Sequence, residues 1–201
     1  MNDCERTLRE LDTIVQEWTL VHRRSTSAAS QLHNLHDQST KTQSQISTAS
    51  SGSQPIPRLQ LLLAMQISEI EAQLSSLRSH VHDYGSVIRR FESLDERVGQ
   101  QPLVDQDDDG VYRVVGITAQ YVVNAVSDRR AEYTKEYARR RQLIGDLVIR
   151  EKIGIAQFSS EWMEAKVDYA VEEDYLERLR LARMARQWQA NCAESERLIT
   201  K

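Results

Sequence analysis

The sequence contains few of the residues that interrupt helices. Among 201 residues there are only seven Gly and three Pro, and all three Pro lie between segments with helical periodicity. Because tight turns and sheet corners consume Gly and Pro, this shortage argues against a β-rich fold. Phe is also rare, with two copies, so the 40% of apolar residues predict a modest core. We therefore expect a helical bundle, or a core that a partner completes.

Cysteine is scarce as well. Cys4 and Cys192 are isolated near opposite ends of the chain, with no CxxC pair and no metal-ligand spacing. This pattern excludes a disulfide framework and favours a reducing compartment. We expect a protein of the nucleus and cytoplasm.

Long apolar runs and a strong charge of one sign are both missing. The most apolar stretch, residues 59–67, contains Gln60 and Gln66 and is far shorter than the roughly 20 residues that a membrane helix needs. The first residues are charged and lack an apolar signal core. The net charge of -4, from 26 basic and 30 acidic residues, gives no general attraction to nucleic acid. We expect a soluble, unsecreted chain with no membrane partner and no direct nucleic-acid partner.

The strongest positive feature is a heptad register in the second segment. Large apolar residues recur there at alternating spacings of four and three, which is typical of a helix that lies along other helices. This helix would be roughly 60 Å long, more than a small bundle covers. We predict that the following residues, the heptad seam, form a partner interface: Leu63, Ile67, Ile70, Leu74, Leu77, Val81, Tyr84, Ile88 and Phe91.

The fold class predicted from these patterns is all-α, an elongated antiparallel helical bundle or coiled coil of about four helices. A Ser/Thr/Gln-rich stretch has too little apolar surface to offset the entropy of ordering and predicts a flexible linker. The expected organisation is an N-terminal helix over 1–37, the linker over 38–57, a long heptad helix over 58–99, an acidic loop over 100–116 and a C-terminal helical hairpin over 117–201.

Several aromatic residues fall on or beside the apolar seams. Within the C-terminal hairpin we expect the last helix to begin near Ser160, capped by Ser159 or Ser160, after a short turn that points Phe158 inward. Buried aromatic side chains contribute large contact areas, so we expect them to join the helices. The predicted anchors of this kind are Trp18, Tyr133, Tyr137 and Trp162.

No motif predicts catalysis or a cofactor. Asp105, Asp107 and Asp109 before Gly110 copy the opening of a calcium loop, but its twelfth position falls on Gly116 instead of Glu. We expect a solvated acidic loop there. His33 with His36, and His80 with His82, lack the companions of a zinc site. Phosphate loops and nucleophile motifs are missing too. We therefore expect no enzyme, no metal site and no cofactor.

Two basic groups leave alternatives open. Arg139-Arg140-Arg141 and the arginines of the last helix predict an ion-paired, solvated face, because acidic residues lie at pairing distance along the helix. A contact with RNA or with an acidic partner is the alternative. The arginines of the last helix are Arg178, Arg180, Arg183 and Arg186.

Two parts of the sequence, about residues 8–35 and 129–169, resemble a known family. The residues that carry the resemblance are Trp18, Leu32, Asn34, Leu35, the run Tyr133-Thr134-Lys135-Glu136-Tyr137, Arg140, Leu143, Ile155, Phe158 and Trp162. The chain is similar to the family of the cyclin-dependent-kinase-interacting protein and the ribosome-maturation factor that works with it. The resemblance adds Leu35 to the expected structural anchors.

The resemblance implies a small helical adaptor. Members of that family partner each other and AAA+ ATPases of the spermatogenesis-associated type, in large ribosomal subunit maturation and in removing replication complexes from chromatin. The expected partners are thus a paralogous helical adaptor and an AAA+ ATPase, in a hetero-oligomer. The alternative is a structural coiled-coil subunit of another assembly, such as a kinetochore, spindle or tethering complex.

Overall fold

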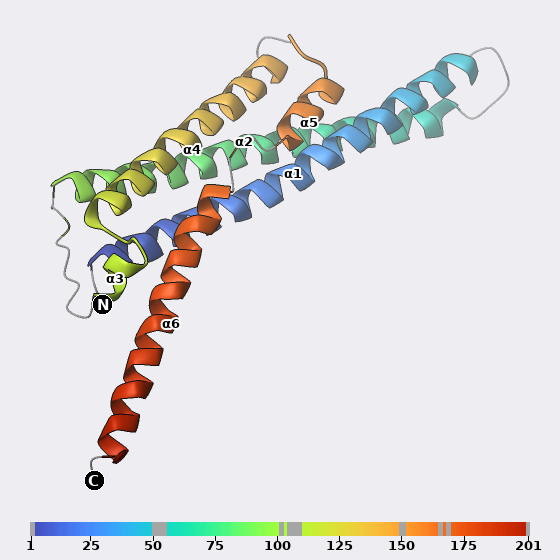
Figure 1. Ribbon diagram of the computed structural model, residues 1–201. Helices are drawn as coiled ribbons and strands as arrows, with labels where there is room; N and C mark the ends of the chain where they lie inside the picture. Colours follow the sequence, from blue (N-terminus) through green and yellow to red (C-terminus); the bar gives the residue numbers. More distant parts are fainter. Residues whose placement is uncertain are drawn as a thin grey trace. The chain divides into compact units, whose positions relative to one another are not determined.

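The computed structural model describes residues 3–49, 56–100, 103, 110–148, 152–164, 167 and 170–199. These residues form six helices and no strand, which confirms the predicted all-α class (Figure 1). In chain order the helices are α1 (Asp3–Ala49), α2 (Ile56–Gln100), α3 (Val111–Val114), α4 (Ala119–Val148), α5 (Ile155–Met163) and α6 (Ala170–Ile199). None of the described helices carries an apolar stretch long enough to cross a bilayer.

The chain divides into two compact units. The first comprises Met1–Gln16, Val87–Thr134 and Val167–Lys201. The second comprises Glu17–Ser86 and Lys135–Lys166. Each of the helices α1, α2 and α4 therefore has residues in both units, whereas α5 belongs to the second unit and α6 to the first.

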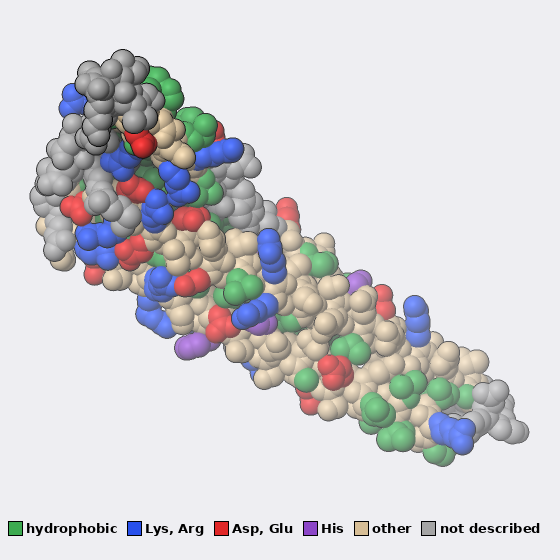
Figure 2. Space-filling model, turned by 90° about the horizontal axis from the view of Figure 1, so that it is seen from below, with side chains coloured by type: hydrophobic (Ala, Val, Ile, Leu, Met, Phe, Trp, Pro, Cys, Tyr) green, Lys and Arg blue, Asp and Glu red, His purple; other side chains and the backbone are tan. Residues whose placement is uncertain are grey.

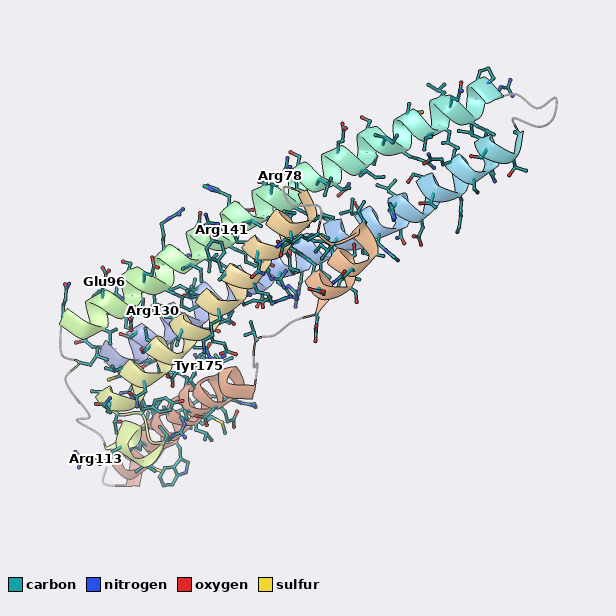
Figure 3. All side chains as sticks on the ribbon, turned by 90° about the horizontal axis from the view of Figure 1, so that it is seen from above. Arg78, Glu96, Arg113, Arg130, Arg141 and Tyr175 are labelled. Atoms are coloured by element: carbon teal, nitrogen blue, oxygen red, sulfur yellow. The ribbon has the colours of Figure 1, made fainter. Side chains whose placement is uncertain are left out.

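The second unit is built on an antiparallel hairpin of α1 and α2, and the last part of α4 packs with α5 against the base of this hairpin (Figures 1 and 3). Trp18 and Trp162 are both buried, as the sequence predicts. Side-chain bonds tie the elements together: Ser25 and Tyr84 hydroxyls lie 2.8 Å apart, and Ser159 Oγ donates to the Ala29 carbonyl at 3.2 Å. These bonds join α1 to α2 and α1 to α5.

The first unit has its own core. The rings of Phe91 on α2 and Tyr133 on α4 are stacked with centroids 4.9 Å apart, and both are fully buried. The single turn of α3 contacts α6. The other buried apolar residues of this unit include Leu8, Leu11, Ile14, Leu94, Val98, Val122, Val126, Tyr175 and Ala182.

The predicted linker over 38–57 is wrong for residues 38–49, which continue α1. The hydroxyl groups of this stretch donate hydrogen bonds within the helix: Thr42 Oγ1 donates to the Gln38 carbonyl at 3.0 Å, and Ser47 Oγ donates to the Gln43 carbonyl at 3.0 Å. Thr42 is buried, because this end of α1 lies along α2. Tertiary packing thus overrides a weak helix propensity. Residues 50–55 lie outside the described part of the chain.

The predicted last helix is also two helices, α5 and α6. Ser159 and Ser160 lie inside α5 and cap nothing, because Ser159 is buried and bonds to α1. Phe158 points inward as predicted. Burial of its ring with that of Trp162, at a centroid distance of 5.1 Å, accounts for a separate short helix here.

Part of the predicted acidic loop over 100–116 is helical. Val111–Val114 form α3, and the glycines that flank this turn, Gly110 and Gly116, have φ values of 71° and 72°. Positive φ costs Gly little and other residues more, so these two glycines let the chain enter and leave the single helical turn. Residues 104–109, with Asp105, Asp107 and Asp109, lie outside the described residues.

Gly85, inside α2, marks a close approach of α4 in the second unit. A Cβ at this position would lie 2.9 Å from Oη of Tyr137. Gly inside a helix lowers stability by about 1 kcal/mol relative to Ala. Gly85 is nevertheless favoured here, because Ala would bring its Cβ too close to the side chain of Tyr137. This explains how Tyr137, a predicted anchor, joins α2 to α4.

We predict that Gly85→Ala gives no gain in the free energy of unfolding in the native background. In a Tyr137→Phe background, which lacks the clashing hydroxyl, the same change should add about 1 kcal/mol through helix propensity. Urea unfolding of the four proteins measures the coupling. Equal effects of Gly85→Ala in both backgrounds would show that the Tyr137 hydroxyl does not restrict this position.

Candidate functional site

The heptad seam is divided between buried and accessible positions. Its later members Leu77, Tyr84, Ile88 and Phe91 are buried by the chain's own helices. The remaining members are half-buried, apart from Ile67, which is 47% exposed. The chain itself therefore covers much of the surface that the sequence predicts as a partner interface, and the part left accessible lies at Leu63, Ile67, Ile70, Leu74 and Val81.

Of the predicted anchors, Trp18, Tyr133 and Trp162 are buried. Leu35 and Tyr137 are half-buried. Trp18 and Trp162 lie in the second unit, where Trp162 contacts a charged residue that the sequence predicts on the surface, and Trp18 contacts the Tyr84 ring on the other side of it.

That residue is Arg140 on α4, whose side chain is 1% exposed and lies between two aromatic rings. Its guanidinium carbon is 5.0 Å from the ring centroid of Tyr84 and 5.0 Å from that of Trp162. The Tyr84 ring in turn contacts Trp18, at a centroid distance of 4.4 Å. The prediction of a solvated Arg139–Arg141 face is therefore wrong for Arg140, and cation–π contacts replace part of its hydration.

The charge of Arg140 is balanced by a buried carboxylate. Its Nε donates to Glu136 Oε1 at 2.7 Å, and Nη2 donates to His22 Nδ1 at 3.0 Å. Glu136 also accepts from Nε of Arg139 at 2.7 Å. Arg139 donates further to the carbonyl of Glu161, at 2.7 Å, and so reaches α5. We call Arg140, Glu136, His22, Tyr84 and Trp162 the Arg140 centre.

The Arg140 centre joins all the helices of the second unit, since its members come from α1, α2, α4 and α5. Arg140 and Glu136 are buried and His22 is half-buried, so the centre is a buried ion pair with hydrogen bonds and ring contacts that hold the helices together. A sequence signal for it exists. Glu136 and Arg140 are four residues apart on the helix face that also carries Tyr133, a spacing that brings their side chains together.

His22 is held neutral in the Arg140 centre. Burial, followed by the positive charge of Arg140, lowers the pKa of His22 to about 4. Because Arg140 donates to Nδ1, the ring accepts there and carries its proton on Nε2. A protonated His22 would lose this bond and face the guanidinium as a like charge.

A second charged cluster lies in the first unit. The guanidinium of Arg178 on α6 lies 4.7 Å from the Tyr121 ring centroid, and its Nε donates to Asp174 at 2.9 Å. Tyr121 also donates to Asp174, at 2.9 Å. Burial and this hydrogen bond raise the pKa of Tyr121 to about 12, and the bond from Arg178 lowers the pKa of Asp174. The phenol is therefore a donor and no nucleophile.

Two arginines of α6 pair with acidic residues of the same helix, as predicted: Arg178 with Asp174, and Arg180 with Glu177 at 3.9 Å. Arg186 instead lies 3.2 Å from Glu5 of α1, a partner that the sequence did not predict. Arg178 also donates to the Val115 carbonyl at 3.1 Å, which holds the segment after α3. These pairs neutralise much of the basic character of α6 and lower its value as a nucleic-acid surface.

Metal and nucleophile candidates stay scattered. Within the described ranges, no three His, Cys, Asp or Glu side chains are placed to hold a metal ion. His33 lies 3.8 Å from Asp37 and His80 lies 3.4 Å from Asp83, each as a pair along one helix. Cys4 is buried and Cys192 is half-buried, and the two form no disulfide bond.

Two exposed apolar faces are the candidate functional surfaces. One is on α2 near the loop end of the hairpin, where Figure 2 shows hydrophobic side chains gathered on the surface: Leu61, Leu62, Met65 and Ile67. The other is on α6, the helix that also carries the four arginines: Leu176, Leu181, Met184 and Trp188. Large exposed apolar side chains in neighbouring turns mark interaction sites. The helical spacing of Leu181, Met184 and Trp188 was the signal in the sequence.

We predict that Arg140→Met lowers the free energy of unfolding by about 3–5 kcal/mol, because Glu136 stays buried with half of its ion pairing removed. The matched control is Arg141→Met, one residue along, whose exposed side chain (labelled in Figure 3) should contribute less than about 0.5 kcal/mol. Urea unfolding followed by circular dichroism measures both. Equal midpoints for the two variants would contradict a structural role of the Arg140 centre.

The pKa of His22 predicts a pH dependence of stability. Its pKa is about 4 in the folded chain and 6.5 when unperturbed, so the unfolded chain binds more protons between these values. Stability should fall as the pH decreases from about 6.5 to about 4. Above this window His22 is neutral in both the folded and the unfolded chain, so it adds no pH dependence there. His22→Gln should flatten this part of the urea-midpoint profile, whereas exposed His82→Gln should not. Identical profiles for both variants would exclude His22 as the titrating group.

Comparison with protein-family models, with curated proteins and with solved structures finds no match for this chain. The comparisons therefore assign it to no family.

Proposed function

We propose that the chain is a non-enzymatic adaptor subunit of an AAA+ ATPase complex, acting in large ribosomal subunit maturation or in removal of replication complexes from chromatin. Its partners in this proposal are a paralogous helical adaptor and the ATPase, in the nucleus and cytoplasm. The resemblance carried by Trp18, the Tyr133–Tyr137 run and Trp162 supports the identity of the partners. The observation that supports binding is the apolar face of α6.

This face, the α6 stripe, consists of Leu181, Met184 and Trp188. The three residues are spaced by three and four positions, so they share one side of the helix, and Trp188 is 68% exposed. Tyr175 and Ala182 of the same helix are buried in the first unit, which occupies another side. Trp is the residue most enriched at the energetic centres of protein interfaces. The α6 stripe thus suits a protein partner.

The charged groups of the described residues support an adaptor more than an enzyme. Arg140, Glu136 and His22 are used in the core of the second unit, and Arg178, Asp174 and Tyr121 hold α6 in the first. In the proposed complex the ATP chemistry belongs to the partner. Our alternative, a structural subunit of another assembly, is favoured by the α1–α2 hairpin, whose loop end resembles a coiled-coil arm (Figure 1).

Affinity purification with mass spectrometry tests the proposal. Wild-type tagged protein should co-purify an AAA+ ATPase and a second small helical protein. Trp188→Glu should weaken their recovery strongly, since loss of an interface Trp typically costs about 2 kcal/mol or more, roughly 30-fold in Kd. The matched control Gln187→Glu adds the same charge at the neighbouring exposed position and should retain both partners.

Recovery of a kinetochore, spindle or tethering complex without an ATPase would replace the proposed function with our alternative. Full recovery of the ATPase by Trp188→Glu would leave the partner in place but exclude the α6 stripe as its binding face.

A further inference from the structure

The α1–α2 hairpin of the second unit carries a second heptad register on its outside. Arg58, Leu62, Met65, Glu69 and Ala72 follow one another on α2 at spacings of four, three, four and three. All five are exposed, and Leu61, at 64% exposure, lies beside them. We call these five residues the outer stripe. Its spacing is that of a helix face that packs along another helix.

The inner face of the same stretch of α2 is used within the hairpin. Four residues that alternate in sequence with the outer stripe are less exposed than its members. Gln66 is buried, and the other three are half-buried: Leu59, Leu63 and Ile70. The stretch of α2 near the loop end therefore has two apolar faces, of which α1 covers one. Leu62 and Met65, at 44% and 62% exposure, form the centre of the other face.

The charges of the outer stripe are arranged symmetrically about this apolar centre. Arg58 lies four residues before Leu62, and Glu69 lies four residues after Met65. Glu69 accepts a hydrogen bond from Gln73 at 3.0 Å, which holds its carboxylate along the helix. Opposite charges at equal distances from a centre are complementary to their own copy turned by 180°.

We propose that the outer stripe binds a second copy of this chain, with the two α2 helices antiparallel about a twofold axis between Leu63 and Ala64. In this register Leu62 packs on Met65 of the second copy, and Arg58 pairs with Glu69 of the second copy. Each contact occurs twice, as a twofold axis requires. A parallel arrangement would place Arg58 beside Arg58 and Glu69 beside Glu69, so the charges select the antiparallel one.

The charge content of the outer stripe favours a second copy over other occupants. One Arg and one Glu leave the stripe neutral, whereas an anionic membrane or nucleic acid is bound by clustered basic residues. The contact is small, so the expected affinity is that of a weak interface, with Kd of about 10–100 µM. The proposed adaptor would then be able to present two α6 stripes. The inference does not depend on which partner these bind.

Sedimentation velocity of the full chain over a concentration series tests the proposal. Wild type should shift reversibly from monomer to dimer. Arg58→Glu places Glu opposite Glu69 twice, and Glu69→Arg places Arg opposite Arg58 twice, so each variant alone should dimerise about tenfold more weakly at low salt. An equimolar mixture of the two variants restores both pairs and should dimerise like wild type.

Two matched controls carry the same charge changes on α2 away from the outer stripe. Arg78→Glu and Glu71→Arg alter exposed residues of the same helix and should leave dimerisation unchanged. Circular dichroism should show every variant as helical as wild type, because all four positions are exposed. Since the measurement uses the isolated chain, it is independent of whether an ATPase co-purifies.

A wild-type chain that stays monomeric across the series overturns the proposal. So does a mixture of Arg58→Glu and Glu69→Arg that dimerises no better than its components, because the antiparallel register requires the rescue. Equal losses in the two control variants would assign the effect to net charge and would also overturn the register.

Discussion

The second unit depends on the burial of one guanidinium. Arg140 cannot leave water without a carboxylate, further acceptors and polarisable surfaces, and the fold supplies Glu136, His22 and the rings of Tyr84 and Trp162. These groups come from all the helices of the unit. A shift of any one helix would separate a partner from the buried charge, so the Arg140 centre restricts how the helices align, in addition to the apolar packing of Trp18 and Phe158.

The same constraint explains features that look unrelated in the sequence. His22 is neutral because it accepts from Arg140, and Arg139 spans from Glu136 to the carbonyl of Glu161. Gly85 follows Tyr84 directly and allows the ring of Tyr137 to lie against α2. The face of α4 that packs in this unit is thus polar at its centre and aromatic at its edges, which a simple apolar stripe would not reveal.

The exposed apolar faces are separate from these cores. In the second unit, α2 has an inner face closed by α1 and an outer face that stays accessible at Leu62 and Met65. In the first unit, α6 is held through Tyr175, Ala182 and Arg178, while Leu181, Met184 and Trp188 remain outside. In both helices one apolar face builds the core of its unit, and the other remains exposed, as at interaction sites.

The all-α class, the position of the long heptad helix α2 and the burial of Trp18 and Trp162 follow from the sequence alone, because they depend on local periodicity and on the scarcity of Gly and Pro. Periodicity marks which residues share a helix face, but it does not say what covers that face. Thus Leu77, Tyr84, Ile88 and Phe91 were expected to meet a partner and are buried within the chain.

The tertiary structure decided the features that depend on contacts between distant segments. Residues 38–49 are helical because α2 lies beside them, and Ser159 bonds to α1 instead of capping a helix. Arg140, which a sequence places on a solvated basic face, is buried because Glu136 lies one turn away and the rings of Tyr84 and Trp162 arrive from other helices. A charge is stable in a core only when its partners converge there, and that convergence is set by the packing of the helices.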